Sequence, residues 1–120
     1  MKRLVLVIIL LWPVMSYGKL GYSGNQMMVF CDGTFKGEPK ENSIIAAVCI
    51  GYLRGIWGAT DVWQETGLLN PKLVCVPQDV TVEQLRRVFL NYMHQNPGAW
   101  GRSVEPHVVI AIKEAWPCKE

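Results

Sequence analysis

Apolar residues along the chain recur mostly at helical spacing, three and four residues apart, and turn residues separate the apolar segments. The longest segment runs from Ile44 to Ala59 with Arg54 as its one charge, and it is too long for a strand. A shorter segment covers Asn25 to Cys31 and stops at the turn pair Asp32-Gly33. The pattern predicts an all-α fold, with these segments as the first two helices.

The third helix has clear signals at both ends. Thr81 and Gln84 form a capping box, in which each side chain satisfies a backbone N–H at the helix start. Asn96-Pro97 ends the helix because the residue before a proline resists helical geometry. Glu83 and Arg87 stand four apart in the favourable order for an ion pair. The predicted buried stripe consists of Leu85, Val88, Phe89 and Tyr92.

A fourth helix is predicted between Ser103, whose side chain can cap it, and Pro117. Its buried stripe consists of Val104, Val108, Ala111, Ile112 and Ala115. Val109 and Ile110 are apolar but lie off this stripe, which suggests a second covered face such as a dimer contact. The expected architecture is a small domain resembling a four-helix bundle.

Small residues recur every four positions in the long apolar segment, at Ala47, Gly51, Gly55 and Ala59, with Gly58 beside them. Glycine costs about 1 kcal/mol relative to alanine inside a helix. We therefore expect a neighbouring backbone to approach this stripe closely. The glycine spacing matches neither of the phosphate-binding glycine motifs.

The segment from Thr60 to Asp79 holds Gly67 and two prolines and is predicted to be an irregular connection. Tryptophans in connections are costly to leave in water unless a partner covers them. Trp63 and Trp100, with nearby charges, have the composition of a protein-binding hot spot, and the alternative is that both rings fold back onto the domain. The candidate partner-binding residues are Asp61, Trp63, Glu65, Trp100 and Arg102.

The first eighteen residues have the layout of a signal peptide. Lys2 and Arg3 precede the apolar stretch Leu4 to Trp12, and Ser16 and Gly18 supply the small residues of a cleavage site. Nine apolar residues are too few to span a bilayer, which takes roughly 20. We therefore expect residues 1–18 to be removed, leaving residues 19–120 as one soluble domain without a membrane anchor.

Removal of Lys2 and Arg3 from the 12 basic residues leaves ten, which balance the ten acidic residues. Binding to nucleic acid or to an anionic membrane surface requires clustered Lys and Arg. A neutral mature chain without a basic run therefore argues against both partners.

The four cysteines all follow the predicted signal peptide, and an even count in an exported chain predicts two disulfides formed in an oxidising compartment. The short turn Asn96 to Arg102 predicts antiparallel third and fourth helices, which would bring Cys118 near Cys75. By elimination, Cys31 pairs with Cys49. The alternative of a zinc site is disfavoured because the gaps between cysteines are 18, 26 and 43 residues.

Catalytic groups are hard to assemble from this sequence. His94 and His107 flank the last turn and could form a metal or acid–base pair, although histidines near a turn more often face solvent. Ser23 lies between glycines but lacks the spacing of a nucleophile elbow. Cysteines in disulfides provide no thiolate. We therefore expect no catalytic residues, no metal site and no cofactor.

The cysteines, caps and turns together resemble the Rap/Tai immunity proteins over the range Cys31 to Cys118. The resemblance is carried by Cys49-Ile50-Gly51-Tyr52-Leu53-Arg54-Gly55, by Cys75-Val76-Pro77 with Val80-Thr81, Gln84-Leu85 and Tyr92, and by Asn96-Pro97 and Ala115-Trp116-Pro117-Cys118. Histidine is commoner in the family than Asn96, and phenylalanine is commoner than Trp116. The segment before Cys49 matches poorly.

This resemblance implies a non-enzymatic periplasmic immunity protein. Such a protein would act as a homodimer that binds a peptidoglycan amidase delivered by type VI secretion and blocks its active-site cleft. The family signature consists mostly of scaffold residues, so it transfers no binding residues to this chain. The alternatives are a small periplasmic helical stress protein or chaperone and, less favoured, a small hydrolase.

Overall fold

The computed structural model describes residues 21–33 and 39–119, and for residues 39–43 only the backbone is described. This part of the chain contains four α-helices and one 3₁₀ turn. The helices are α2 (Gly24–Asp32), α3 (Pro39–Glu65), α4 (Val82–Gln95) and α5 (Glu105–Ala115), and the 3₁₀ turn is η2 (Pro97–Ala99). These elements confirm the predicted all-α fold. The predicted signal peptide, residues 1–18, lies outside the described residues.

The helix α3 is longer than the sequence pattern predicted. It continues past Ala59 to Glu65, so the expectation of an irregular segment from Thr60 onward was wrong for its first six residues. Thr60 and Gln64 are buried and extend the stripe begun by Cys49 and Leu53, which gives these residues a core contact that favours the helix. The rest of the connection, up to the start of α4, is irregular as predicted.

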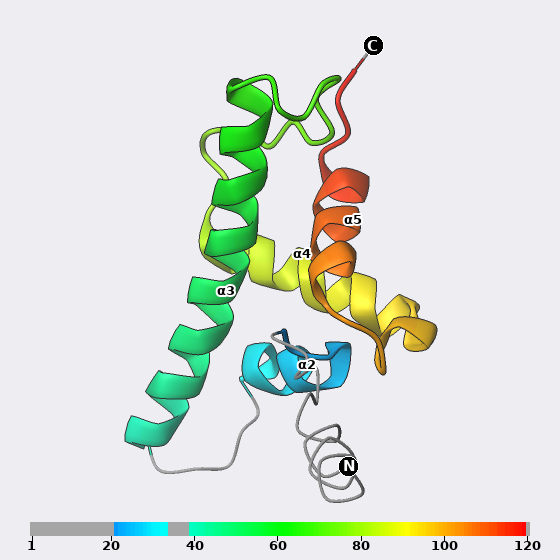
Figure 1. Ribbon diagram of the computed structural model, residues 1–120. Coiled ribbons are helices and arrows are strands. Elements are labelled where there is room, and N and C mark those ends of the chain that lie inside the picture. The colour runs from blue at the N-terminus through cyan, green and yellow to red at the C-terminus, as the bar shows by residue number, and fades with distance from the viewer. Residues whose placement is uncertain (1–20, 34–38, 120) are drawn as a thin grey trace, which may run out of the picture.

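The core lies on one side of α3, and in Figure 1 the helices α2, α4 and α5 all lie on that side. Phe89 and Met93 of α4 and Leu53 of α3 are fully buried within it. The predicted stripe of α4 is confirmed at Leu85 and Phe89, and the sequence analysis missed Met93. The other core residues are Met27, Cys31, Cys49, Val74, Leu85, Ala99, Val104, Val108, Ala111 and Ile112.

Both predicted disulfides are present. The Cα atoms of Cys31 and Cys49 are 5.1 Å apart, and those of Cys75 and Cys118 are 4.9 Å apart. The reason for the second pairing differs from the expected one, because Figure 1 shows α5 crossing α4 and running alongside α3. The residues after α5 therefore meet the segment that follows α3, and the N–H of Cys75 donates to the carbonyl oxygen of Trp116 at 3.0 Å.

A capping box of Ser23 and Gln26 starts α2, so the side chain of Ser23 caps a helix. By contrast, Ser103 does not cap α5, whose first turn nevertheless contains the expected proline. Ser103 instead forms an antiparallel bridge with Ser23, and the N–H of Val104 donates to the carbonyl oxygen of Tyr22 at 3.0 Å. These bonds hold the chain before α5 against the start of α2.

The small-residue stripe of α3 is not covered by any part of the described chain. Gly51, Gly55 and Gly58 are exposed, and a Cβ atom placed on any of them would have no neighbour within 4 Å. The expectation that another backbone of this chain packs there was therefore wrong. The part of α3 from Ile44 to Glu65, 22 residues, is also long and apolar enough to cross a membrane by length and composition, but its other face forms the core described above.

Candidate functional site

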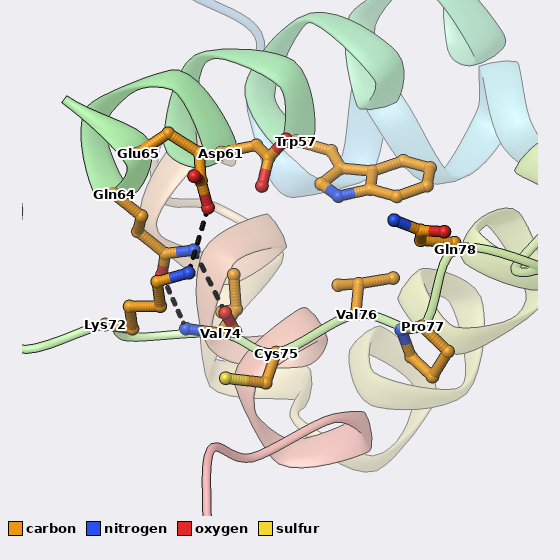
Figure 2. A pocket seen from close by; sticks show the side chains of 10 residues that line it. All are labelled: Trp57, Asp61, Gln64, Glu65, Lys72, Val74, Cys75, Val76, Pro77 and Gln78. Atoms are coloured by element: carbon orange, nitrogen blue, oxygen red, sulfur yellow. Dashed lines mark hydrogen bonds and ion pairs between the residues drawn. The ribbon is translucent and has the colours of Figure 1, made fainter.

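A groove of about 520 Å³ lies between the last turns of α3 and the extended segment that follows it. Figure 2 shows Trp57 and Asp61 pointing into this groove from α3, opposite Val76 and Gln78. The other residues that line it are Gln64, Glu65, Lys72, Val74, Cys75 and Pro77. Two of the candidate binding residues, Asp61 and Glu65, are therefore at this groove.

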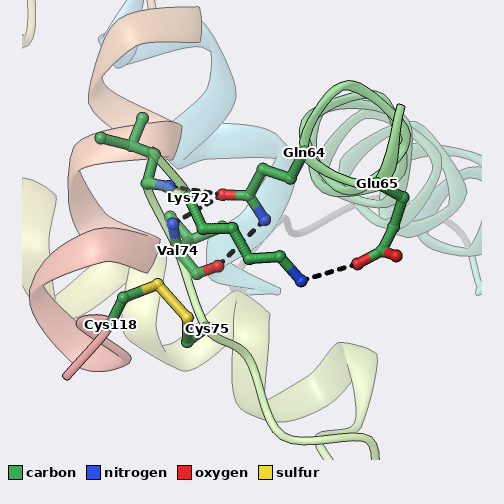
Figure 3. The surroundings of a disulfide bond; sticks show 7 residues. Gln64, Glu65, Lys72, Val74, Cys75 and Cys118 are labelled. Carbon is green, nitrogen blue, oxygen red and sulfur yellow. Dashed lines mark hydrogen bonds and ion pairs between the residues drawn. A yellow bond between two sulfur atoms is a disulfide. The ribbon is translucent and has the colours of Figure 1, made fainter. Parts of the chain in front are cut away.

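Gln64 fixes the far wall of the groove. Its Oε1 accepts hydrogen bonds from the N–H groups of Leu73 and Val74 at 2.7 and 2.8 Å, and its Nε2 donates to the carbonyl oxygen of Val74 at 3.0 Å (Figure 3). Gln64 is 7% exposed, so these bonds satisfy backbone groups that water reaches poorly. The next residue, Cys75, is joined to Cys118. The wall is thus anchored at two consecutive residues.

An ion pair closes one end of the groove. Lys72 Nζ lies 2.9 Å from Glu65 Oε1, and both side chains are more than half exposed. The hydrogen bond from Lys72 lowers the pKa of Glu65, and the same bond raises the pKa of Lys72. An exposed pair of this kind adds little stability, so its main effect is to position two opposite charges beside Asp61.

Three apolar side chains at the end of α3 and in the loop after it are exposed, and we call them the tip. The exposed fractions are 57% for Val62, 52% for Trp63 and 79% for Leu68. The N–H of Leu69 donates to the carbonyl oxygen of Trp63 at 2.9 Å, which folds the loop after α3 back onto the end of the helix. Val62 and Leu68 were not among the predicted binding residues, because neither residue type marks a binding surface in a sequence.

The other two candidate residues, Trp100 and Arg102, lie elsewhere. They precede α5, whereas Trp116 at the end of α5 lies beside the groove, so the length of that helix, about 16 Å, separates the two regions. Trp100 is half-buried and packs on the core, and its Nε1 donates to the carbonyl oxygen of Met93 at 2.7 Å. The alternative that the ring folds back onto the domain therefore holds for Trp100, while Trp63 is exposed.

Most of the other candidate catalytic groups have structural partners, while His94 is exposed. The ring Nδ1 of His107 lies 3.2 Å from the hydroxyl of Tyr92, and Ser23 Oγ accepts from the N–H of Gln26. All four cysteines are in disulfides. Over residues 21–33 and 39–119, no group of three or more His, Cys, Asp or Glu side chains could hold a metal ion.

A family model described as Rap1a immunity proteins matches residues 23–118 of the chain. The match begins at the cap of α2 and ends at the last cysteine, so it covers every described helix. No curated protein and no solved structure matches the chain.

Proposed function

Because the chain belongs to the Rap1a immunity protein family, we propose that it protects its cell by binding and inhibiting a peptidoglycan amidase delivered by type VI secretion. Immunity proteins act on a secreted effector by binding it, and catalysis by the immunity protein is not required. The amidase is the finer part of this proposal and comes from the resemblance to Rap/Tai proteins.

The exposed tip of Val62, Trp63 and Leu68 is the observation that supports binding at this end of the molecule. A tryptophan flanked by aliphatic side chains is the usual centre of a protein-binding hot spot, because its burial excludes water from a large apolar area. The groove at the same end of α3 supplies charged and amide groups that can orient a partner. We propose that the amidase covers the tip and the mouth of the groove.

The proposed location is the periplasm, after cleavage of the signal peptide near Gly18. Two disulfides are consistent with an oxidising compartment. A protein that meets a cell-wall enzyme must also be on the same side of the inner membrane as the wall. We further propose that the chain acts as a homodimer.

Alanine substitution at the tip tests the proposed binding surface. We expect Trp63→Ala and Leu68→Ala each to weaken inhibition of an amidase encoded next to this chain, with a rise in Kd of about 30-fold for Trp63→Ala. Val29→Ala on α2 is the matched control, because Val29 is 52% exposed and lies on another helix. Isothermal titration gives the Kd, and circular dichroism confirms that each variant is folded.

Co-expression provides the test in cells. Cells that export the amidase to the periplasm should lyse without this chain and survive with it. Equal lysis in both cultures would contradict inhibition of that amidase. Full protection by Trp63→Ala, with an unchanged Kd, would contradict the assignment of the tip.

A further inference from the structure

The groove at the end of α3 contains one carboxylate that the fold does not use. Asp61 lines the groove and is exposed, and its side chain makes no hydrogen bond or ion pair with any group that the structure describes. Lys72 lines the same groove but is paired with Glu65 at 2.9 Å. The pKa of Lys72 is raised mainly by its hydrogen bond to Glu65 and least by the charge of Asp61, so Lys72 acts chiefly on Glu65.

An aromatic ring lies beside this carboxylate. Trp57 stands four residues before Asp61, so the two side chains share one face of α3, and Figure 2 shows both opposite Val76 and Gln78. Trp57 is half-buried, because part of its ring packs against the core and part lines the groove. Its indole N–H and the amide of Gln78 have no hydrogen-bond partner within the described part of the chain. The groove therefore presents a ring, a carboxylate and an amide that the fold leaves unused.

The charge of the groove favours a cationic group. Among the described residues, its lining has two carboxylates, Asp61 and Glu65, and one ammonium group, Lys72, so its net charge is −1. A negative groove attracts cations and repels anions. A guanidinium group is planar, so it can stack on an aromatic ring and form two parallel hydrogen bonds with one carboxylate, whereas an ammonium group is a compact point charge. An arginine side chain therefore fits the unused groups better than a lysine side chain does.

Burial by a partner makes such a pairing necessary. The proposed function places the amidase over the tip and the mouth of the groove, and this inference rests on that placement. Once covered, Asp61 loses contact with water, and a carboxylate removed from water without a cation is strongly destabilised. Lys72, the one cation among the described lining residues, is already paired. The partner therefore has to supply the cation.

We propose that one arginine side chain of the effector enters this groove, pairs with Asp61 and stacks on Trp57, with the amide oxygen of Gln78 as a further acceptor. The tip supplies apolar contact area, and the arginine supplies the recognition of charge. An enzyme with a neutral or acidic residue at that place would leave Asp61 buried and unpaired, so it would bind more weakly. Asp61 is thus a specificity-determining residue for the effector.

A small ligand tests the groove without the effector. N-acetyl-arginine amide is titrated into the mature chain, with the neutral isostere N-acetyl-citrulline amide as the matched ligand. The indole N–H signal of Trp57 in two-dimensional NMR, assigned with Trp57→Leu, reports binding. We expect a Kd of about 10 mM for the arginine compound and binding at least about fivefold weaker for the citrulline compound. Asp61→Asn should abolish this difference, and equal binding of the two compounds to the unsubstituted chain would overturn the proposal.

A double-mutant cycle with the amidase identifies the arginine. Asp61→Asn should raise the Kd for the amidase about 20-fold. Asp79→Asn is the matched control, since Asp79 is exposed but does not line the groove, and it should change the Kd less than about twofold. Each arginine of the amidase is then replaced by glutamine in turn. Against one of these variants, Asp61→Asn should have no further effect on the Kd.

The outcomes separate this inference from the proposed function. An unchanged Kd in Asp61→Asn, with weaker binding by Trp63→Ala, would overturn the arginine site and retain inhibition of the amidase. An Asp61→Asn effect that persists in full against every arginine variant of the amidase would also overturn the site. Loss of amidase binding altogether, with the arginine compound still bound beside Trp57, would reject that amidase as the partner and retain the groove as a site for a guanidinium group. Circular dichroism confirms that each variant is folded.

Discussion

Gly24 lies at the closest approach between α2 and the turn that follows α4. A Cβ atom at this position would be 2.5 Å from Cε of Met93 and 2.7 Å from the carbonyl oxygen of Ala99. The N–H of Gly24 donates to the carbonyl oxygen of Arg102 at 3.0 Å, which holds the two segments at this distance. This glycine is required by packing within the chain, whereas Gly51, Gly55 and Gly58 of α3 have open space around them.

We predict that Gly24→Ala lowers the free energy of unfolding by about 1–3 kcal/mol, because a methyl group there overlaps with neighbouring backbone. Gly98→Ala is the matched control. Gly98 lies in η2 with open space around it and should change stability by less than about 0.5 kcal/mol. Urea denaturation of both variants measures the difference, and equal midpoints would contradict the close packing.

Helix ends were predicted correctly where a capping residue or a proline next to the helix agrees with the pattern of core contacts. Both ends of α4 were predicted, because its capping box and Asn96-Pro97 act within a few residues. Ser23 and Gln26 carry the same capping pattern, but a short apolar segment gave little reason to look for it. The end of α3 was placed too early because the polar residues Thr60 and Gln64 are buried there, and their burial depends on distant parts of the chain.

The start of α4 is joined to α2 by Arg86. This side chain pairs with Glu83, three residues earlier, and also donates to the carbonyl oxygen of Cys31 at the end of α2. Arg87, the partner expected from the sequence, lies 3.4 Å from Glu83 as a second and longer contact. Glu83 therefore holds Arg86 in position for a contact between two helices.

We predict an acid-dependent contribution to stability from Glu83. The hydrogen bond from Arg86 lowers the pKa of Glu83 from 4.5 to about 2. Because the pKa is lower in the folded state, the stabilisation is complete above pH 4.5 and is lost as the pH falls toward 2. Glu83→Gln should therefore be less stable than the unsubstituted chain near pH 7 and equal to it near pH 2.

Thermal unfolding at several pH values measures this effect. Glu114→Gln is the control, since Glu114 of α5 has no ion pair within the described part of the chain. The control should match the unsubstituted chain near pH 7. A difference between Glu83→Gln and the unsubstituted chain that stays constant down to pH 2 would contradict the role of this carboxylate.

At the scale of the whole molecule, one face of α3 packs against the core, while the face with Gly51, Gly55 and Gly58 is exposed. The sequence predicted both disulfides, although the helix arrangement that brings Cys118 to Cys75 differs from the expected one. The small residues of α3 were also recognised in the sequence, but we expected them to pack against another part of the chain. Their spacing does not specify whether another part of the chain reaches them. Of the candidate binding residues, Asp61, Trp63 and Glu65 lie together, while Trp100 and Arg102 required the structure to place them.

We predict that the two disulfides differ in accessibility and that each contributes strongly to stability. Cys31 and Cys49 are 1% and 0% exposed, whereas Cys75 is exposed. Graded dithiothreitol followed by alkylation and mass spectrometry should therefore detect Cys75–Cys118 reduced first. Replacing both cysteines of that pair with serine should lower the free energy of unfolding by about 2–4 kcal/mol, because it closes a loop of 43 residues.

Simultaneous reduction of both disulfides would show that the buried pair opens as easily as the exposed one. Replacement of Cys75 and Cys118 without a loss of stability would contradict a crosslinking role. The unsubstituted chain in alkylating agent without reductant is the control and should remain unmodified.

The segment at Val74 and Cys75 is anchored by two separate interactions, so the sequence near it can change during evolution without loss of the fold. Gln64 and Cys118 hold the wall of the groove, while Leu68 and its neighbours carry no part of the core. Substitutions at the tip can therefore accumulate without unfolding the protein. A lineage could change the effector that it neutralises by altering a few side chains while the fold stays the same, and related copies would then give immunity to different rivals.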